Sequence, residues 1–158
     1  MFQALTYFAL SLITLIVIAP LLKTRIAPWI GTVSRIADGD SVEARLWFTQ
    51  RCIRLAGFDA PEWKQSYGRE ARTALVSRIE GRRVLFIPTD VDRYGRVVCM
   101  VITRRGPLSW RMVASGNAWS DSFMTSILSI IPRVFGRGLW ADPARIHPSL
   151  WRSANPRR

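Results

Sequence analysis

Four short segments of the chain gather acidic residues, arginines and glycines. They are DGDSV at 38–42, RLAGFDAPE at 54–62, YGREA at 67–71 and DRYGR at 92–96. A DGD triplet alone is more often a hairpin turn than a metal site, so each segment is weak by itself. Together they offer what hydrolysis of a phosphodiester requires: a general base, a positioned water, positive charge for the developing dianion and ligands for a hard cation.

The acidic residues of these segments could divide into metal ligands and a base. Asp40 opens one predicted strand and Asp59 closes another, so their carboxylates could lie side by side. Calcium prefers such oxygen ligands, with waters completing its shell. Glu62 follows Asp59 in a turn stiffened by Pro61, which could direct Glu62 at a water instead of at the metal.

Two arginines of these segments belong to the predicted strands. Arg54 lies in the third strand, and Arg96 begins the fifth strand behind Gly95, which permits a tight bend. Both could belong to an exposed basic face, or both guanidinium groups could converge on one phosphate. Arg54 stands between Ile53 and Leu55, where its charge would be unfavourable without an anionic partner, and this favours the second interpretation.

The elements that must position these side chains form an α+β pattern. Strands are predicted at 32–37, 40–46, 51–58, 84–89 and 96–103, and helices at 67–80 and 108–115. Ser66 is expected to cap the first helix and Gly81 to end it. Three strands, a helix and two strands is the order of the OB-fold, so we expect a five-stranded OB-fold barrel with about three helices.

The motifs resemble the staphylococcal-nuclease (thermonuclease) family. The similarity covers roughly residues 31–140, because the four segments and a later GLW at 138–140 follow the family pattern in order and approximate spacing. It implies an OB-fold nuclease that uses calcium to hydrolyse DNA and RNA and leaves 3′-phosphate ends. It also implies that Asp40 and Asp59 are calcium ligands, with the main-chain carbonyl of Ala60 as a third.

The same resemblance implies roles for the residues that meet the substrate. Arg54 and Arg96 would bind the scissile phosphate and stabilise the transition state. Glu62 would be the general base for the attacking water. Arg93 and Tyr94 match positions that contact a neighbouring phosphate.

A long apolar run precedes the predicted domain. Residues 4–22 carry no charge and are numerous enough to cross a bilayer as a helix, so we expect an uncleaved, single-pass membrane anchor over 1–23. A cleaved signal peptide is the alternative, but no basic residue precedes the run and no clear cleavage site follows it. Lys23 and Arg25 would hold the domain in the cytoplasm, whereas a calcium requirement favours the extracytoplasmic side, which we expect.

The rest of the chain divides into a linker at 24–30, the OB-fold domain at 31–142 and a basic tail at 143–158. The tail is rich in Pro, Ser and Arg, so we expect it to be poorly ordered. The formal net charge of +12 favours nucleic acid or anionic lipid headgroups as partners. One histidine and two cysteines leave little for a zinc site or for His-assisted nucleophilic chemistry. No oligomeric state follows from the sequence.

The segment at 120–135 departs from the family pattern. The family usually has nucleotide-contacting aromatic residues there, followed by a polar, basic helix, whereas this chain has an apolar helical pattern interrupted by Pro132. We expect a helix that packs on the core. The alternative is an interfacial helix that rests on the same membrane as the anchor.

Two other functions compete with a nuclease. A non-catalytic OB-fold module that binds nucleic acid is compatible with the same fold, because a fold does not determine a function. The complete set of acidic residues and arginines argues against it. An envelope-associated role in surface-polysaccharide production is a third hypothesis, which only the apolar run suggests.

Overall fold

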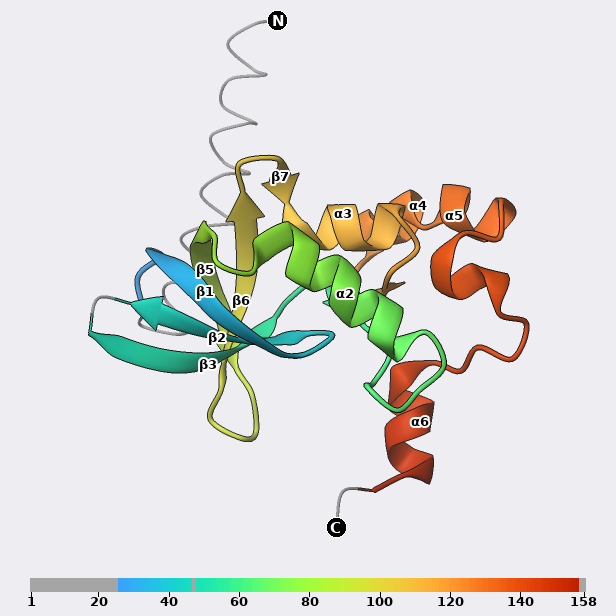
Figure 1. Ribbon diagram of the computed structural model, residues 1–158, viewed down its shortest axis with the longest axis horizontal. Helices are drawn as coiled ribbons and strands as arrows, with labels where there is room; N and C mark the ends of the chain where they lie inside the picture. Colours follow the sequence, from blue (N-terminus) through green and yellow to red (C-terminus); the bar gives the residue numbers. More distant parts are fainter. Residues whose placement is uncertain (1–25, 47, 157–158) are drawn as a thin grey trace, which may run out of the picture.

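The computed structural model describes residues 26–46 and 48–156, and a closed β-barrel lies at its centre (Figure 1). The strands of the barrel are β1 (Trp29–Asp38), β2 (Ser41–Leu46), β3 (Thr49–Leu55), β5 (Arg83–Val91) and β6 (Val97–Thr103). β1 pairs antiparallel with β2 and β5, β2 with β3, and β5 with β6. Parallel pairing of β3 with β6 closes the barrel. This five-stranded α+β barrel is consistent with the predicted OB-fold.

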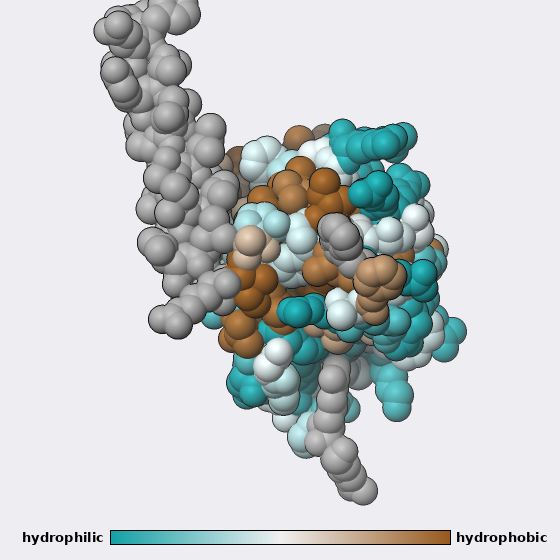
Figure 2. Space-filling model, turned by 90° about the vertical axis from the view of Figure 1, so that its left-hand side faces the viewer, coloured by the Kyte–Doolittle hydropathy of each residue, from teal (hydrophilic) through white to brown (hydrophobic). Residues whose placement is uncertain are grey.

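The barrel interior is filled by apolar side chains that alternate along the strands. Val33, Val42, Ile53 and Phe86 are all fully buried. Burial of one such side chain stabilises the fold by about 1.5–3 kcal/mol. Trp29 stacks on Phe86 with ring centroids 5.5 Å apart and so anchors the start of β1. On the face shown in Figure 2, hydrophobic residues gather beside the point where the described chain begins, and the lowest part of the face is mainly hydrophilic.

Short strands extend the barrel and change two predicted boundaries. β4 (Phe58–Asp59) pairs with β8 (Trp119–Ser120), and β7 (Gly106–Pro107) pairs with the end of β6. The strand predicted at 51–58 is interrupted because Gly57 has a positive φ of 86°. β1 begins at Trp29, so the end of the expected linker at 24–30 is already part of the sheet.

The two helices predicted around the barrel are confirmed, with one change at a cap. The helices are α2 (Gly68–Ile79) and α3 (Leu108–Ala114). α2 buries Ala71, Leu75 and Ile79, as its apolar spacing predicted. Ser66 does not cap α2, because its hydroxyl donates to Asp142 and the left-handed residue Tyr67 precedes the helix instead.

The apolar segment at 120–135 differs from the expectation of one helix packed on the core. It forms two short helices, α4 (Phe123–Leu128) and α5 (Ile130–Val134). The residues that these helices bury are Thr125, Ser129 and Pro132, while most of the large apolar side chains point to solvent. Leu128 packs against the core, but the apolar face as a whole does not, so this prediction is wrong.

The C-terminal part contains the short helices η1 (Gly138–Ala141) and α6 (Pro148–Ala154). Helix α6 replaces the poorly ordered tail expected at 143–158, and with α4 and α5 it brings the helices above the expected three. Pro148 at the first turn and the His147 side chain, which accepts from the Ser149 amide, explain why α6 starts there.

The structure does not test the predicted membrane anchor. Across 26–46 and 48–156 no helix has the length and apolarity needed to cross a bilayer. The anchor predicted at 4–22 lies outside the described residues. Both cysteines, the exposed Cys52 and the buried Cys99, are free.

Candidate active site

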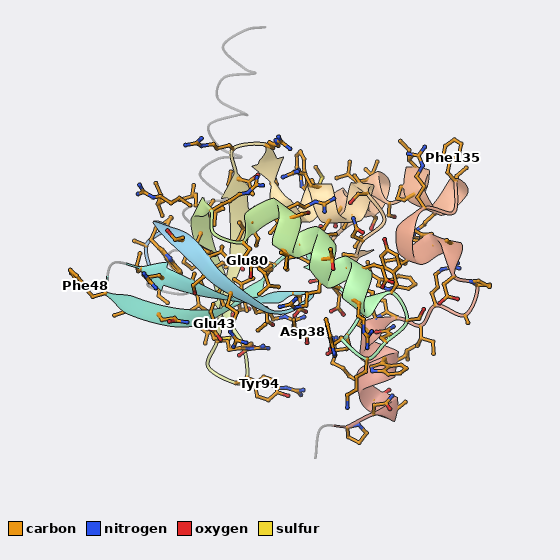
Figure 3. The ribbon with its side chains drawn as sticks, in the orientation of Figure 1. Asp38, Glu43, Phe48, Glu80, Tyr94 and Phe135 are labelled. Carbon is orange, nitrogen blue, oxygen red and sulfur yellow. The ribbon has the colours of Figure 1, made fainter. Side chains whose placement is uncertain are left out.

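A pocket of about 990 Å³ opens at the end of the barrel where β1 turns into β2 and β5 turns into β6. Most of the predicted site residues line it: Asp40, Arg54, Glu62, Arg93, Tyr94 and Arg96. Asp59 and Ala60 are buried beside these residues. Figure 3 shows Asp38 and Tyr94 among the polar side chains of this region. The structure therefore brings the predicted residues together in one place.

The tight turn between β1 and β2 sets the position of Asp40. Gly39 has no side chain, and a Cβ there would lie 2.7 Å from the Cβ of Ala60, so a larger residue would push the turn away from the Asp59 segment. Asp40 accepts a hydrogen bond from the hydroxyl of Ser41 at 2.9 Å. Its carbonyl accepts from the amide of Leu55 at 2.8 Å. Asp40 and Asp59 are thereby held on one side of the pocket.

Arg54 connects the two aspartates. It lies directly opposite Ser41 in the β2–β3 pairing. Its Nη1 is 3.0 Å from Asp40 Oδ2, and its Nη2 is 3.6 Å from Asp59 Oδ1. Burial raises the pKa of Asp40 from 3.8 to about 6, although Arg54 acts to lower it. The single guanidinium group therefore only partly compensates the buried carboxylate.

Arg96 reaches the same region because β3 and β6 lie side by side, with Ile53 paired to Val97. Its Nε donates to Asp92 Oδ2 at 2.7 Å, and its Nη1 donates to Ser41 Oγ at 3.2 Å. Burial acts to raise the pKa of Asp92, but hydrogen bonds from Arg96 and from the Tyr94 amide hold it below its ordinary value. Asp92 thus remains ionised and orients the guanidinium group of Arg96.

Tyr94 forms an exposed aromatic surface at the rim of the pocket. Its side chain is 68% exposed. The guanidinium carbons of Arg93 and Arg96 lie 4.9 Å and 5.6 Å from the ring centroid. An aromatic ring flanked by positive charge suits a nucleic-acid strand, because bases stack on such rings and phosphates pair with the arginines.

Glu62 is held by the loop that leads into α2. Its amide donates to the side-chain oxygen of Gln65 at 3.1 Å, and its carbonyl accepts from the Gln65 amide at 2.8 Å. A Cβ at Gly68 would lie 2.0 Å from the carbonyl oxygen of Glu62, so only glycine allows α2 to begin this close. The loop therefore directs Glu62 into the pocket, which it lines.

The sequence is similar to a known protein family. The sequence pattern of the family described as "Staphylococcal nuclease homologue" matches residues 52–128. Over 145 residues the chain is 35% identical to Protein ParB of Escherichia coli, with 81% of this chain and 82% of the relative covered. The chain belongs to the staphylococcal nuclease family.

Two other relatives of this staphylococcal nuclease homologue have names that mention an activity. One is an Escherichia coli protein described as an uncharacterized endonuclease, 35% identical over 128 residues, with 77% of this chain and 84% of the relative covered. The other is the micrococcal nuclease of Shigella flexneri, 28% identical over 166 residues, with 93% and 95% covered. The family match at 52–128 contains Arg54, Glu62 and Arg96, while Asp40 precedes it.

Arg152 of α6 is a site residue of this staphylococcal nuclease homologue that the sequence analysis missed. Its Nη1 donates to Glu62 Oε1 at 2.9 Å and to Asp59 Oδ1 at 3.3 Å, and its Nη2 donates to Asp59 Oδ2 at 2.9 Å. The bonds to Asp59 and Glu62 raise the pKa of Arg152, so it stays charged. Its position in a basic, Pro-rich tail offered no signal of this contact.

Asp40 and Asp59 offer the carboxylate oxygens that calcium prefers, but in this structure both carboxylates are paired with arginines. Among residues 26–46 and 48–156 no group of three or more His, Cys, Asp or Glu side chains is placed to hold a metal ion. Asp40 and Asp59 share Arg54 instead, and Asp59 also binds Arg152. Two buried carboxylates, of which Asp40 is only partly compensated by Arg54, fit a divalent cation that prefers oxygen ligands and whose shell is completed by a carbonyl and waters.

Proposed function

We propose that this chain is a calcium-dependent nuclease that hydrolyses phosphodiester bonds of DNA, RNA or both and leaves 3′-phosphate ends. The observation that carries the proposal is the gathering of Arg54, Arg96 and Glu62 around one pocket at the end of a barrel. The names of two relatives, an endonuclease and a micrococcal nuclease, support the same class of reaction.

In this proposal the two arginines recognise the phosphate that is cleaved. Arg54 lies in β3 and Arg96 directly precedes the neighbouring strand β6, and each side chain is about one-quarter exposed. A phosphate in the pocket would take the place of Asp40 and Asp59 on Arg54, while Asp92 keeps the guanidinium group of Arg96 oriented. Both arginines would then stabilise the charge that develops on the phosphate as the water attacks, which is the largest electrostatic contribution in reactions of this kind.

Glu62 is proposed to accept the proton of the attacking water. A carboxylate on a loop held by Gln65 can keep the fixed distance to a water that a general base needs. Asp40, Asp59 and the carbonyl of Ala60 would hold calcium, which supplies positive charge to the phosphate and orients the reacting groups. Arg93 and Tyr94 would contact a neighbouring phosphate of a single or frayed strand.

Arg152 has to leave before this chemistry can begin. Its hydrogen bonds occupy one oxygen of Glu62 and both oxygens of Asp59. Neither the base nor the metal ligand is available while they persist. The contact also favours a second candidate function, a non-catalytic module that binds nucleic acid through its basic rim while the acidic residues stay paired.

One experiment separates the two functions. The full-length chain in detergent is incubated with single-stranded DNA and RNA, with calcium or with a chelator. We expect cleavage with calcium only, and Glu62→Gln should lose at least about a hundredfold of the rate while retaining binding. Glu80→Gln is the matched control, because Glu80 is exposed and does not line the pocket (Figure 3). Unchanged cleavage by Glu62→Gln would remove this residue from the mechanism, and salt-sensitive binding without product would favour the non-catalytic module.

The location is part of the proposal. We propose that residues 4–22 anchor the chain in a membrane and that the pocket lies outside the cytoplasm, where calcium is abundant. Protease treatment of intact and permeabilised cells tests the orientation. Digestion of the domain only after permeabilisation would contradict it.

A further inference from the structure

Helices α4 and α5 present a cluster of large apolar side chains to solvent. The cluster, called here the α4–α5 apolar surface, consists of Met124, Ile127, Ile130, Ile131, Val134 and Phe135. Each of these side chains is between 52% and 73% exposed. Single exposed apolar residues are ordinary on a protein surface, but a contiguous cluster of this kind marks an interaction site.

Specific polar contacts hold these helices with their apolar residues outward. The buried Thr125 hydroxyl donates to the carbonyl of Gly57 at 3.3 Å, and Ser122 caps the start of α4 by accepting from the Thr125 amide. The buried Ser129 hydroxyl donates to the carbonyl of Ser126 at 2.6 Å where the two helices meet. Rotating the apolar side chains inward would turn Thr125 away from the core and deprive the carbonyl of Gly57 of this donor, which is unfavourable.

The α4–α5 apolar surface lies away from the pocket. In Figure 1, α4, α5 and β7 occupy the upper part of the molecule, whereas α6 and the loop between β5 and β6 lie at the bottom. Figure 3 shows the same separation for Phe135 and Tyr94. A flat partner that covers the α4–α5 apolar surface would therefore leave the pocket open.

The described chain also begins at the end of the sheet remote from the pocket. Trp29 at the start of β1 pairs with Phe86, which pairs with Val101 near the end of β6. Asp38 at the other end of β1 lines the pocket. The uncharged run at 4–22 ends four residues before Ile26. Four residues span at most about 14 Å, so a bilayer that holds this run lies close to the domain.

Two arginines border the α4–α5 apolar surface, and two more lie on the same upper side of the molecule. Arg133 and Arg137 are exposed on and just after α5, and Arg137 lies 5.3 Å from the ring centroid of Phe135. Arg104 and Arg105 are exposed in the turn between β6 and β7, in the same upper part of the molecule. Exposed apolar side chains rimmed by guanidinium groups fit the interface of a bilayer that contains anionic phosphate headgroups.

We propose that the α4–α5 apolar surface inserts into the interfacial region of the membrane in which residues 4–22 are anchored, so that the pocket faces away from the bilayer. The run at 4–22 is uncharged and mostly apolar, so most of its apolar side chains would stay in water if it covered α4 and α5 instead. Tethering by a short linker makes even weak insertion effective, because the second contact is intramolecular. This inference rests on the proposed anchoring of residues 4–22 and not on the proposed nuclease activity.

The test uses the full-length chain in lipid nanodiscs containing anionic lipid. A fluorophore is attached at Ile131→Cys in a Cys52→Ser background, since burial raises the pKa of Cys99 to about 12 and keeps that thiol unreactive. We expect a blue-shifted emission that lipid-borne nitroxides quench and aqueous iodide does not. The same fluorophore at Thr73→Cys, exposed on α2, should respond to iodide only.

A matched pair of variants completes the test. Phe135→Glu should move the emission of the label at 131 back toward that of a label in water, whereas Phe48→Glu, 99% exposed and outside the cluster, should leave it unchanged. Quenching of the label at 131 by iodide but not by lipid nitroxides would overturn the proposal. Protection from both quenchers would also overturn it, because residues 4–22 or a second copy of the chain would then cover the surface.

Discussion

Replacing Arg152 with alanine should strengthen calcium binding. Arg152 donates three hydrogen bonds to Asp59 and Glu62 at 2.9 to 3.3 Å, so a cation that uses Asp59 has to displace it. The Arg152 side chain is 37% exposed. Ion pairs of this exposure contribute about 0–1 kcal/mol each, which gives at most about 2 kcal/mol for the contacts with both carboxylates.

The free energy of these contacts determines how much the calcium affinity should increase when Arg152 is replaced. About 2 kcal/mol corresponds to a factor of about 30 in the ratio of closed to open sites, so Arg152→Ala should bind calcium more tightly than the unaltered chain, by up to about 30-fold. Arg152→Lys keeps the charge but lacks the fork that spans two carboxylates, and it should fall between the two. Titration calorimetry of the full-length chain in detergent measures the three affinities without reference to cleavage.

Arg145→Ala is the matched control. Arg145 is exposed, and its guanidinium group donates to the carbonyl of Asp142 and lies over the ring of Trp140, so its loss changes the net charge equally. If Arg152→Ala and Arg145→Ala bound calcium equally well, a general charge effect would account for both. The idea that Arg152 competes with the cation would then be refuted.

Three other perturbations follow from the site and its rim. In calcium-free protein the raised pKa of Asp40 means that this group stabilises the folded state below pH 3.8 and that the stabilisation is lost as the pH rises through about 6. The increase in the pKa corresponds to about 3 kcal/mol of folding free energy. Asp40→Asn should remove this part of the pH dependence of thermal unfolding. Gly68→Ala should lower the free energy of unfolding by about 1–3 kcal/mol and slow cleavage, because the added Cβ would overlap the Glu62 carbonyl. Denaturant titration measures the change in stability, and a rate assay measures the change in cleavage. Arg93→Ala should weaken binding of all nucleic-acid sequences and reduce the slope of log affinity against log salt by about 1, while the exposed Arg83→Ala, outside the pocket lining, should not.

The sequence predicted the barrel and the gathering of the site residues because both depend on local signals. Alternating apolar residues determine which face of each strand is buried, and turn residues such as Gly39 mark where the strands end. Once the order of strands is known, Asp40, Arg54 and Arg96 fall at strand ends that meet at one end of the barrel. Their proposed roles in catalysis remain predictions.

The C-terminal half was harder to predict because long-range contacts decide its structure. Arg152 contacts Asp59 and Glu62 about ninety positions earlier in the chain, and no local periodicity encodes such a pair. Its helix is held by distant groups: the Gln65 side chain donates to the carbonyl of Ile146, and the ring of Trp119 lies against His147. A tail rich in Pro and Arg is therefore ordered by what it contacts.

For helices α4 and α5 the local pattern was clear, but the packing predicted from it was wrong. Their apolar spacing was read as a face that packs on the core, since burial of apolar area is the usual driving force. Thr125 and Ser129 instead supply the inward face through hydrogen bonds, and the apolar side chains remain outside. Periodicity identifies an apolar face, but it does not say whether protein or another phase covers that face.

The parallel contact between β3 and β6 has a consequence for the way the protein folds. It pairs Ile53 with Val97, two positions separated by β4, α2 and β5. Closing so long a loop reduces the conformational entropy of the chain before the contacts between the strands can stabilise it, so this pairing should form late and slowly. Because Arg54 and Arg96 become neighbours only at that step, recovery of phosphate binding during refolding should lag behind the appearance of helical signal from α2. A nascent chain released before Val97 would already contain Arg54 and Arg96 but would lack β6, the strand that brings them together.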